Sequence, residues 1–243
     1  MSSLTRKKKK ELYKVVENSR SVKLDRPKKS HTDTVPIKDV KIIEKMMNYL
    51  KMQIKKTENS SIWKKYIARR NYIMVLLGLN TALRTEDILQ LRAINIIKNR
   101  FVITENKTLK DQKFYLNQQV QNEVLQFITD FEIGDHEYIL QSRTQSGGDN
   151  KPITRSQAFK IMKVIGNAIG INYTFGMHSL RKTFGYHYVM KSKDKATALL
   201  NLQKIYNHGS IKTTQLYINW SDDDVETTRQ DFYLGIKPWN KKK

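Results

Sequence analysis

The sequence predicts a mainly α-helical protein with one small antiparallel β-sheet, an α+β fold. Apolar residues recur at steps of three and four along most of the chain, as in Ile37, Val40, Ile43 and Met47, and this spacing is typical of helices that pack on a core. Between about residues 94 and 116 the period becomes strand-like, with short β-prone runs separated by turn-forming residues. Apolar residues make up 39% of the 243 residues, which is enough for one large packed domain.

The expected helices follow one another from Pro36, which suits a first helical position, to a short helix that carries Tyr217. Their ranges are 36–54, 63–79, a short helix with Thr85 as cap, 120–131, 154–169 with Thr154 as cap, 195–206 with Asp194 as cap, and a short helix with Ser210 as cap. The expected strands are 94–97, 101–104 and 113–116, and the polar segment 141–151 is expected to be a loop.

The chain carries 45 Lys and Arg against 23 Asp and Glu, a formal net charge of +22. So large a positive charge indicates a polyanionic partner, which favours DNA or RNA over an anionic membrane surface. No run approaches the roughly 18 apolar residues of a membrane span, so no membrane partner is expected. The absence of cysteine removes disulfides and thiolate chemistry and fits a cytoplasmic protein.

Composition divides the chain into a basic arm at 1–35, a packed domain at 36–220 and a C-terminal segment at 221–243. The arm holds eleven Lys or Arg and four acids, and it is interpreted either as a solvated tail or as an arm that follows DNA phosphates. The three acids at 222–224 cannot all face one ion, so they indicate a helix start, and no metal site is expected. The candidate phosphate contacts in the arm are Lys7, Lys8, Lys9, Lys10, Lys28 and Lys29.

Four residues in the second half of the chain indicate phosphate chemistry. His178 and Arg181 are three apart and share a face of a helix, so both can contact one ligand. An arginine fork matches phosphate oxygens, and a histidine can share a proton with them. His208 follows, and Tyr217, nine residues later, is a candidate nucleophile toward phosphorus. Each residue alone also fits an ordinary surface or helix-end position, but together they indicate a site that breaks and rejoins a phosphodiester.

Arg84 extends this set, because it ends an apolar run where another core residue is expected. On its own it is either a phosphate contact or an ion-pair partner of Asp87. Taken in order, Arg84 and the four residues above make about residues 36–220 resemble the catalytic domain of the tyrosine recombinases, the phage integrases and related site-specific recombinases. The run LLGLNTALRTEDILQL resembles the family's first-arginine box, with Asp87 at the position of the acidic partner.

Three further boxes carry the resemblance. ENKTLKDQKFYL resembles the family's β-hairpin, which supplies a catalytic lysine; Lys107 is the best match, ahead of Lys110 and Lys113. HSLR matches the HxxR box, and NHGSIKTTQLYI resembles the box LGHxSxxTTxxY, which contains the second histidine and the tyrosine. This last match departs from the pattern at Asn207, where glycine is usual, and at Gly209.

The resemblance implies the tyrosine recombinase catalytic-domain fold and the reaction of that family. Tyr217 would attack a DNA phosphate to give a 3′-phosphotyrosyl link, and Lys107 would protonate the departing 5′-oxygen. The two arginines and two histidines would offset the charge that grows on the nonbridging oxygens. Because the link keeps the energy of the broken bond, no ATP, metal ion or other cofactor is expected.

The resemblance also implies partners. They are double-stranded DNA with a specific recombination site, further copies of the chain in a tetramer linked through 221–243, and an accessory DNA-bending or excision protein. The chain would belong to a bacterial or phage mobile element and act at the nucleoid. Only 35 residues precede the expected catalytic domain, where most members have a helical core-binding domain. A DNA-binding regulator that does not recombine is therefore the alternative function, and a type IB topoisomerase matches these boxes less well.

Overall fold

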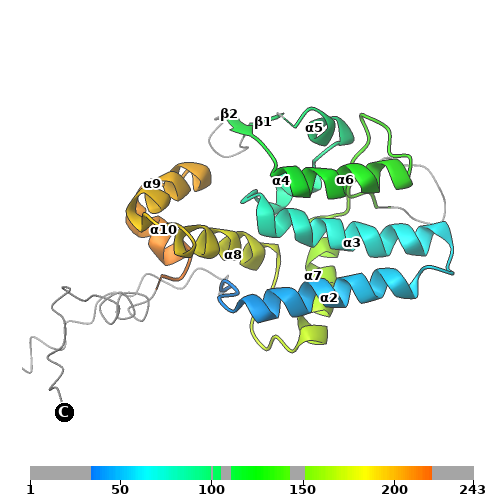
Figure 1. Cartoon of the computed structure of the whole chain (residues 1–243), viewed down its shortest axis with the longest axis horizontal. Helices are drawn as coiled ribbons and strands as arrows, with labels where there is room; N and C mark the ends of the chain where they lie inside the picture. The colour runs from blue at the N-terminus through cyan, green and yellow to red at the C-terminus, as the bar shows by residue number, and fades with distance from the viewer. Residues whose placement is uncertain (1–33, 100, 105–110, 143–150, 221–243) are drawn as a thin grey trace, which may run out of the picture. The chain divides into compact units, whose positions relative to one another are not determined.

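The computed structural model describes residues 34–99, 101–104, 111–142 and 151–220, and this part of the chain is mainly α-helical (Figure 1). None of the helices described there is long and apolar enough to cross a membrane. The strands are β1 (Phe101–Thr104) and β2 (Asp111–Phe114). The helices are α2 (Val40–Lys56), α3 (Ile62–Asn80), α4 (Thr85–Leu89), α5 (Ala93–Ile97), α6 (Gln118–Asp130), α7 (Arg155–Ile169), α8 (Met177–Met190), α9 (Lys195–Tyr206) and α10 (Ile211–Tyr217).

Helix α3 is the central helix, with α2 and α6 on either side of it in Figure 1 and α8 against its C-terminal half. In that half Ile73, Met74, Val75 and Leu77 are consecutive or nearly so, and all four are buried. A helix that is apolar on every side must be enclosed by other elements, which explains why three helices surround α3. Helix α7 packs against α2 and α8 and completes the main core.

A second, smaller apolar cluster lies where α8, α9 and α10 meet, at the left of Figure 1. It lies beneath the segments that carry the predicted site residues, so its packing determines where those residues point. The buried members of the cluster are Ala82, Tyr186, Val189, Ala198, Leu199, Leu202, Tyr206 and Ile218.

Helix α2 begins at Val40, so the predicted start at Pro36 is wrong. The carboxylate of Asp39 accepts a hydrogen bond from the backbone N–H of Lys41 at 2.8 Å and caps the helix at that point. The other predicted caps of long helices are confirmed: Thr154 begins α7 and Asp194 begins α9.

The residues before α2 run along α8. The backbone N–H of Ile37 donates to the Thr183 hydroxyl at 2.8 Å, and the Ile37 carbonyl lies 2.9 Å from Nε2 of His187. Lys182 reaches the carbonyl of Thr34 at 2.5 Å. These bonds replace the helical hydrogen bonds that 36–39 would otherwise make, and they give His187 a structural partner far away in sequence.

The predicted strand at 94–97 is wrong, because these residues belong to the short helix α5. The side chain of Asn95 accepts a hydrogen bond from the Arg92 N–H at 2.8 Å, which begins the helix. The N–H of Ile94 is bonded to the carbonyl of Asp135 at 2.8 Å, so the segment is fixed to the loop after α6. A short apolar run has the same pattern in a buried helix and in a buried strand, and periodicity could not separate them.

Strands β1 and β2 pair in antiparallel register, with Phe101 opposite Phe114 and Thr104 opposite Asp111. The first strand agrees with the sequence, whereas the second is two residues earlier than the predicted 113–116. Lys107 belongs to 105–110, between the two strands, and lies outside the described residues.

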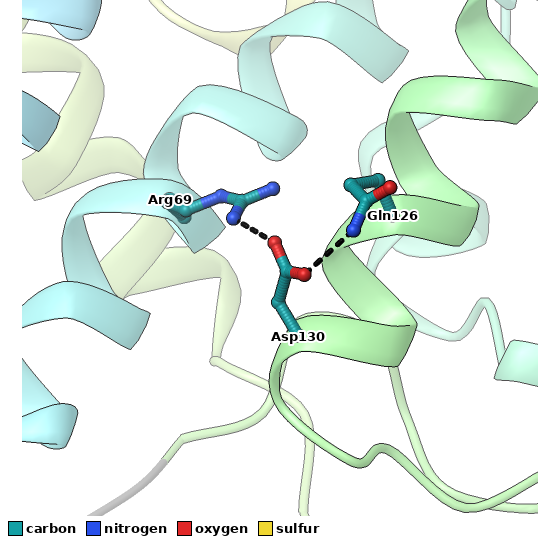
Figure 2. Close-up of polar contacts among 3 residues, drawn as sticks. All are labelled: Arg69, Gln126 and Asp130. Carbon is teal, nitrogen blue, oxygen red and sulfur yellow. Dashed lines mark hydrogen bonds and ion pairs between the residues drawn. The ribbon is translucent and has the colours of Figure 1, made fainter.

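An ion pair on the surface joins α3 to α6 (Figure 2). The guanidinium of Arg69 is paired with Asp130, whose other oxygen accepts a hydrogen bond from Gln126 at 2.7 Å. Burial raises the pKa of Asp130, but the hydrogen bonds from Gln126 and Arg69 and the charge of Arg69 outweigh it and lower the pKa overall. Exposed pairs of this kind contribute at most about 1 kcal/mol, so packing, not this pair, holds the two helices together.

Candidate active site

Helix α8 places His178 and Arg181 one turn apart, as the spacing predicts. The helix begins at Met177, and the Ser179 hydroxyl accepts a hydrogen bond from the Gly176 N–H at 3.2 Å at its start. His178 therefore lies in the first turn and is half-buried. Arg181 is only 6% exposed, and a buried guanidinium needs partners that fix its position.

The partners of Arg181 come from two other segments. Its guanidinium donates to the backbone carbonyl of Ala82, in the loop between α3 and α4. Ala82 has a positive φ of 56°, which turns the chain after α3 and brings Arg84 close to the same place. Arg181 also acts on Tyr217, because its charge lowers the pKa of the Tyr217 hydroxyl against the effect of burial. A single buried arginine thus joins the loop of Arg84 to the end of α10.

The start of α4 differs from the prediction. Arg84 holds the cap position, and Thr85 is the first residue of the helix and is buried. The Asp87 carboxylate accepts a hydrogen bond from the backbone N–H of Arg84 at 3.3 Å. Asp87 thus lies beside Arg84, where the sequence places it, and accepts a bond from the arginine's backbone.

His208 follows the end of α9, and its place depends on Asn207. Asn207 has a φ of 53°, and the N–H groups of Asn207 and His208 bond back to the carbonyls of Lys204 and Gln203, each at 3.0 Å. This is the glycine-type helix ending, and asparagine is the residue that best tolerates it after glycine. Asn207 thus forms a left-handed helix ending of the kind that glycine commonly provides.

The ring of His208 faces α10. Its Nδ1 lies 3.1 Å from the hydroxyl of Thr214, which is buried and also donates to the carbonyl of Ser210 at 3.4 Å. The contact of Nδ1 with the Thr214 hydroxyl fixes the orientation of the ring and leaves Nε2 directed away from Thr214. Ser210 caps α10 as predicted, by accepting from the Thr213 N–H at 3.1 Å.

Tyr217 is the last residue of α10, and its ring lies near His208 and Lys182. Its ring centroid is 5.1 Å from that of His208, and the ammonium of Lys182 lies 5.2 Å from the ring. Burial raises the pKa of Tyr217, while the charge and hydrogen bond of Arg181 and the charge of Arg84 act against that shift. The hydroxyl is therefore protonated at neutral pH and lies next to two cations.

Two charged residues beside His178 were not predicted as site residues. Burial lowers the pKa of His178, the charges of Arg155, Arg181 and Lys182 lower it further, and Glu86 opposes them. Arg155 and Glu86 form an ion pair of 3.0 Å between α7 and α4. His178 is consequently neutral at pH 7. No sequence motif marks Arg155, which is brought to His178 only by the packing of α7 on α4 and α8.

The structure thus brings together six of the predicted site residues: Arg84, Asp87, His178, Arg181, His208 and Tyr217. The predicted lysines Lys7, Lys8, Lys9, Lys10, Lys28, Lys29 and Lys107 lie outside the described residues. In the part of the chain that is described, no three His, Asp or Glu side chains gather as they would around a metal ion.

Comparison with known proteins gives the same assignment. The model of the phage integrase family matches residues 43–223. A probable integrase/recombinase of Bacillus subtilis, YoeC, is 35% identical over 166 residues, which cover 68% of this chain and 85% of that protein. The tyrosine recombinase XerD of Staphylococcus epidermidis is 28% identical over 170 residues, which cover 68% of this chain and 55% of XerD.

Solved structures agree on the fold. The XerA recombinase has a TM-score of 0.56 at 18% identity, with 91% of this chain and 72% of that chain covered. The XerH recombinase, bound to its palindromic difH substrate after cleavage, has a TM-score of 0.58 at 18% identity, covering 82% and 53%. The mainly helical catalytic-domain fold that the sequence predicts is therefore confirmed, and the chain belongs to the phage integrase family, the tyrosine recombinases.

Proposed function

We propose that this chain is a site-specific recombinase that cuts and rejoins double-stranded DNA through a covalent link to Tyr217. The observation that carries the proposal is the convergence of charge and aromatic groups on Tyr217: the His208 ring centroid lies 5.1 Å from that of Tyr217, and the charges of Arg181 and Arg84 lower the pKa of its hydroxyl against the effect of burial. Two arginines beside a nucleophile favour a target that carries negative charge, and a phosphodiester carries that charge on the oxygens of the reacting phosphorus.

In this reaction the nonbridging oxygens of the scissile phosphate bind between Arg84 and Arg181. The Tyr217 oxygen forms a bond to phosphorus as the bond from phosphorus to the 5′-oxygen breaks. The Tyr217 proton passes to His178, whose lowered pKa leaves it neutral at pH 7 and able to accept it. His208, oriented by Thr214, donates to a nonbridging oxygen. Attack of a 5′-hydroxyl on the phosphotyrosine reverses the steps and rejoins a strand.

Tyr217→Phe tests the nucleophile. On a nicked substrate that traps the covalent product, the variant should bind DNA as tightly as the parent and form no adduct. The matched control is Tyr115→Phe, which removes the hydroxyl of an exposed tyrosine (60% exposed) and should leave adduct formation unchanged. An adduct in Tyr217→Phe would assign the nucleophile to another residue. No adduct in the parent, on its proper site, would favour the DNA-binding regulator.

Lys107 is proposed as the acid that protonates the departing 5′-oxygen. Lys107→Ala should then cleave ordinary DNA about 100- to 10,000-fold more slowly, the usual contribution of general acid catalysis. A substrate with sulfur as the bridging 5′-atom needs no such proton, so on it the variant should approach the parent's rate, whereas Arg84→Ala and Arg181→Ala should stay slow. Rescue of Lys110→Ala in place of Lys107→Ala would assign the acid to Lys110.

The remaining parts of the chain are proposed to serve assembly on DNA. The arm at 1–35, with its lysines, contacts phosphates outside the domain at 36–220, and the segment at 221–243 links protomers in a tetramer on paired sites. An accessory DNA-bending or excision protein takes part, and the DNA substrate places the reaction at the bacterial nucleoid. Deleting 1–35 should lower the affinity for all sequences alike and flatten its salt dependence, and an unchanged salt slope would make the arm a solvated tail.

A further inference from the structure

Tyr206, the last residue of α9, has contacts that no predicted role of the site explains. It is fully buried, at 0% exposed. Its hydroxyl donates to the backbone carbonyl of Arg181. In an α-helix this carbonyl pairs with the N–H four residues later, so the hydroxyl is a second donor to the turn of α8 that carries Arg181.

The ring of Tyr206 contacts three of the predicted site residues. The guanidinium carbon of Arg181 lies 4.4 Å from the ring centroid, over the face of the ring. On the side of α9 and α10, the centroids of His208 and Tyr217 lie 5.3 Å and 5.1 Å from that of Tyr206. One aromatic ring thus lies between the arginine on α8 and the two residues that follow α9.

The backbone of α8 is shaped to admit this side chain. A Cβ atom at Gly185 would lie 2.4 Å from the Tyr206 hydroxyl oxygen, which is closer than real Cβ atoms approach. Glycine in the middle of a helix costs about 0.5–1 kcal/mol relative to alanine, so its presence here needs a packing reason. The approach of Tyr206 supplies that reason.

We propose that Tyr206 is a positioning residue, which sets the guanidinium of Arg181 relative to the Tyr217 hydroxyl. The inference rests on the proposed function of those two residues. The hydroxyl of Tyr206 fixes the turn of α8, the ring face supports the guanidinium, and the ring packs against the rings of His208 and Tyr217. Burial raises the pKa of Tyr206, so its hydroxyl is a proton donor at neutral pH.

The experiment compares Tyr206→Phe, which keeps the ring, with Tyr206→Leu, which removes it. Adduct formation is measured in a single turnover at saturating DNA, next to the dissociation constant of the same DNA. We expect a rate about 5-fold lower in Tyr206→Phe, the effect of one hydrogen bond, and at least about 10-fold lower in Tyr206→Leu, with unchanged DNA affinity. The matched control is Tyr66→Phe, because Tyr66 is equally buried and its hydroxyl also donates to a backbone carbonyl, that of Ile139 at 3.1 Å.

Tyr66→Phe should lower the thermal stability of the protein and leave the rate of adduct formation unchanged. The positioning role is supported if Tyr206→Phe forms the adduct faster than Tyr206→Leu but more slowly than the parent, and if Tyr66→Phe forms it at the parent's rate. A parental rate in Tyr206→Leu overturns it, and so does a loss of rate that Tyr66→Phe reproduces at equal loss of stability.

A second measurement does not depend on DNA and separates this inference from the proposed function. With ¹³C at Cζ of the tyrosines, the signal of Tyr217, identified by its loss in Tyr217→Phe, reports the surroundings of its hydroxyl, which include the charge of Arg181. The signal should shift in Tyr206→Leu and stay in place in Tyr66→Phe. A parent that forms no adduct overturns the proposed function alone, whereas an unmoved Tyr217 signal in Tyr206→Leu overturns the positioning role.

Discussion

Replacing Gly185 with alanine tests the packing on which the site depends. The added Cβ would lie 2.4 Å from the hydroxyl oxygen of Tyr206, 2.8 Å from Cγ2 of Ile218 and 3.0 Å from Cζ of Tyr206. These atoms belong to a fully buried ring and a fully buried aliphatic side chain, so neither can turn aside into solvent. Either the ring leaves the turn of α8, or α8 moves away from α9 and α10.

The cost follows from these contacts. Overpacking a buried site by a methyl group costs about 1–3 kcal/mol, and loss of the bond from the hydroxyl to the carbonyl of Arg181 adds about 1 kcal/mol. Gly185→Ala should therefore lower the free energy of unfolding by about 2–4 kcal/mol. The control is Gly209→Ala, since nothing lies within 4 Å of a Cβ at Gly209, and the change there should stay within about 0.5 kcal/mol.

A double-mutant cycle with Tyr206→Phe makes the test specific. Phenylalanine lacks the oxygen of the 2.4 Å contact, and the nearest remaining contact of the new Cβ is then that to Ile218 at 2.8 Å. The double variant should be more stable than the sum of the two single changes by about 1 kcal/mol, a coupling within the range for residues in contact. Urea unfolding of the four proteins measures it. Strict additivity would refute the reasoning, because it would mean that the hydroxyl does not occupy the space at Gly185.

Three further predictions concern the neighbouring residues. Asn207→Gly should leave the free energy of unfolding and the rate of adduct formation unchanged. Asn207→Val should lower the free energy of unfolding by about 1–2 kcal/mol in urea unfolding, because a β-branched residue strongly disfavours a positive φ. Equal stability of the two variants would contradict the left-handed helix ending at Asn207. The folded protein holds the pKa of His178 below the ordinary 6.5, so the unfolded chain binds more protons as the pH falls through 6.5 and the free energy of unfolding decreases there. His178→Asn should make this decrease smaller than in the parent. Parallel curves of stability against pH for the two proteins would contradict the lowered pKa. NMR titration of the His178 ring should show a pKa that Glu86→Gln lowers further and Arg155→Gln raises. Lys160→Gln, on α7 like Arg155, is the control and should leave this pKa unchanged. Shifts in the same direction for Glu86→Gln and Arg155→Gln would contradict the charge arrangement around His178.

The motif residues were predictable from the sequence because their chemistry fixes both residue type and spacing. His178 and Arg181 needed only a helix to share a face, and Ser210 needed only its own side chain to begin α10. Local rules also gave the helix ending at Asn207, although not that the turn would match the glycine form. The catalytic-domain fold followed from the same motifs.

Features that depend on distant partners were not predictable. The helix at 94–97 is decided by a bond to Asp135, and the extended segment before α2 by bonds to Thr183 and His187. Arg155 reaches His178 only because α7 packs against α4 and α8. The positioning role of Tyr206 was not predictable either, because its contacts come from α8 and from the residues after α9. From the sequence alone, a tyrosine at this place is interpreted as an ordinary core residue.

The central claim is that Tyr217 carries the DNA, and the most direct test is to find the modified residue. The parent protein is trapped on a nicked recombination site, digested with trypsin and nuclease, and the nucleotide-bearing peptide is sequenced by mass spectrometry. We predict that the phosphate lies on the peptide 213–229, in which Tyr217 is the only tyrosine. A phosphate on the peptide 205–212, which contains Tyr206, or on the peptide with Tyr233 would contradict the account.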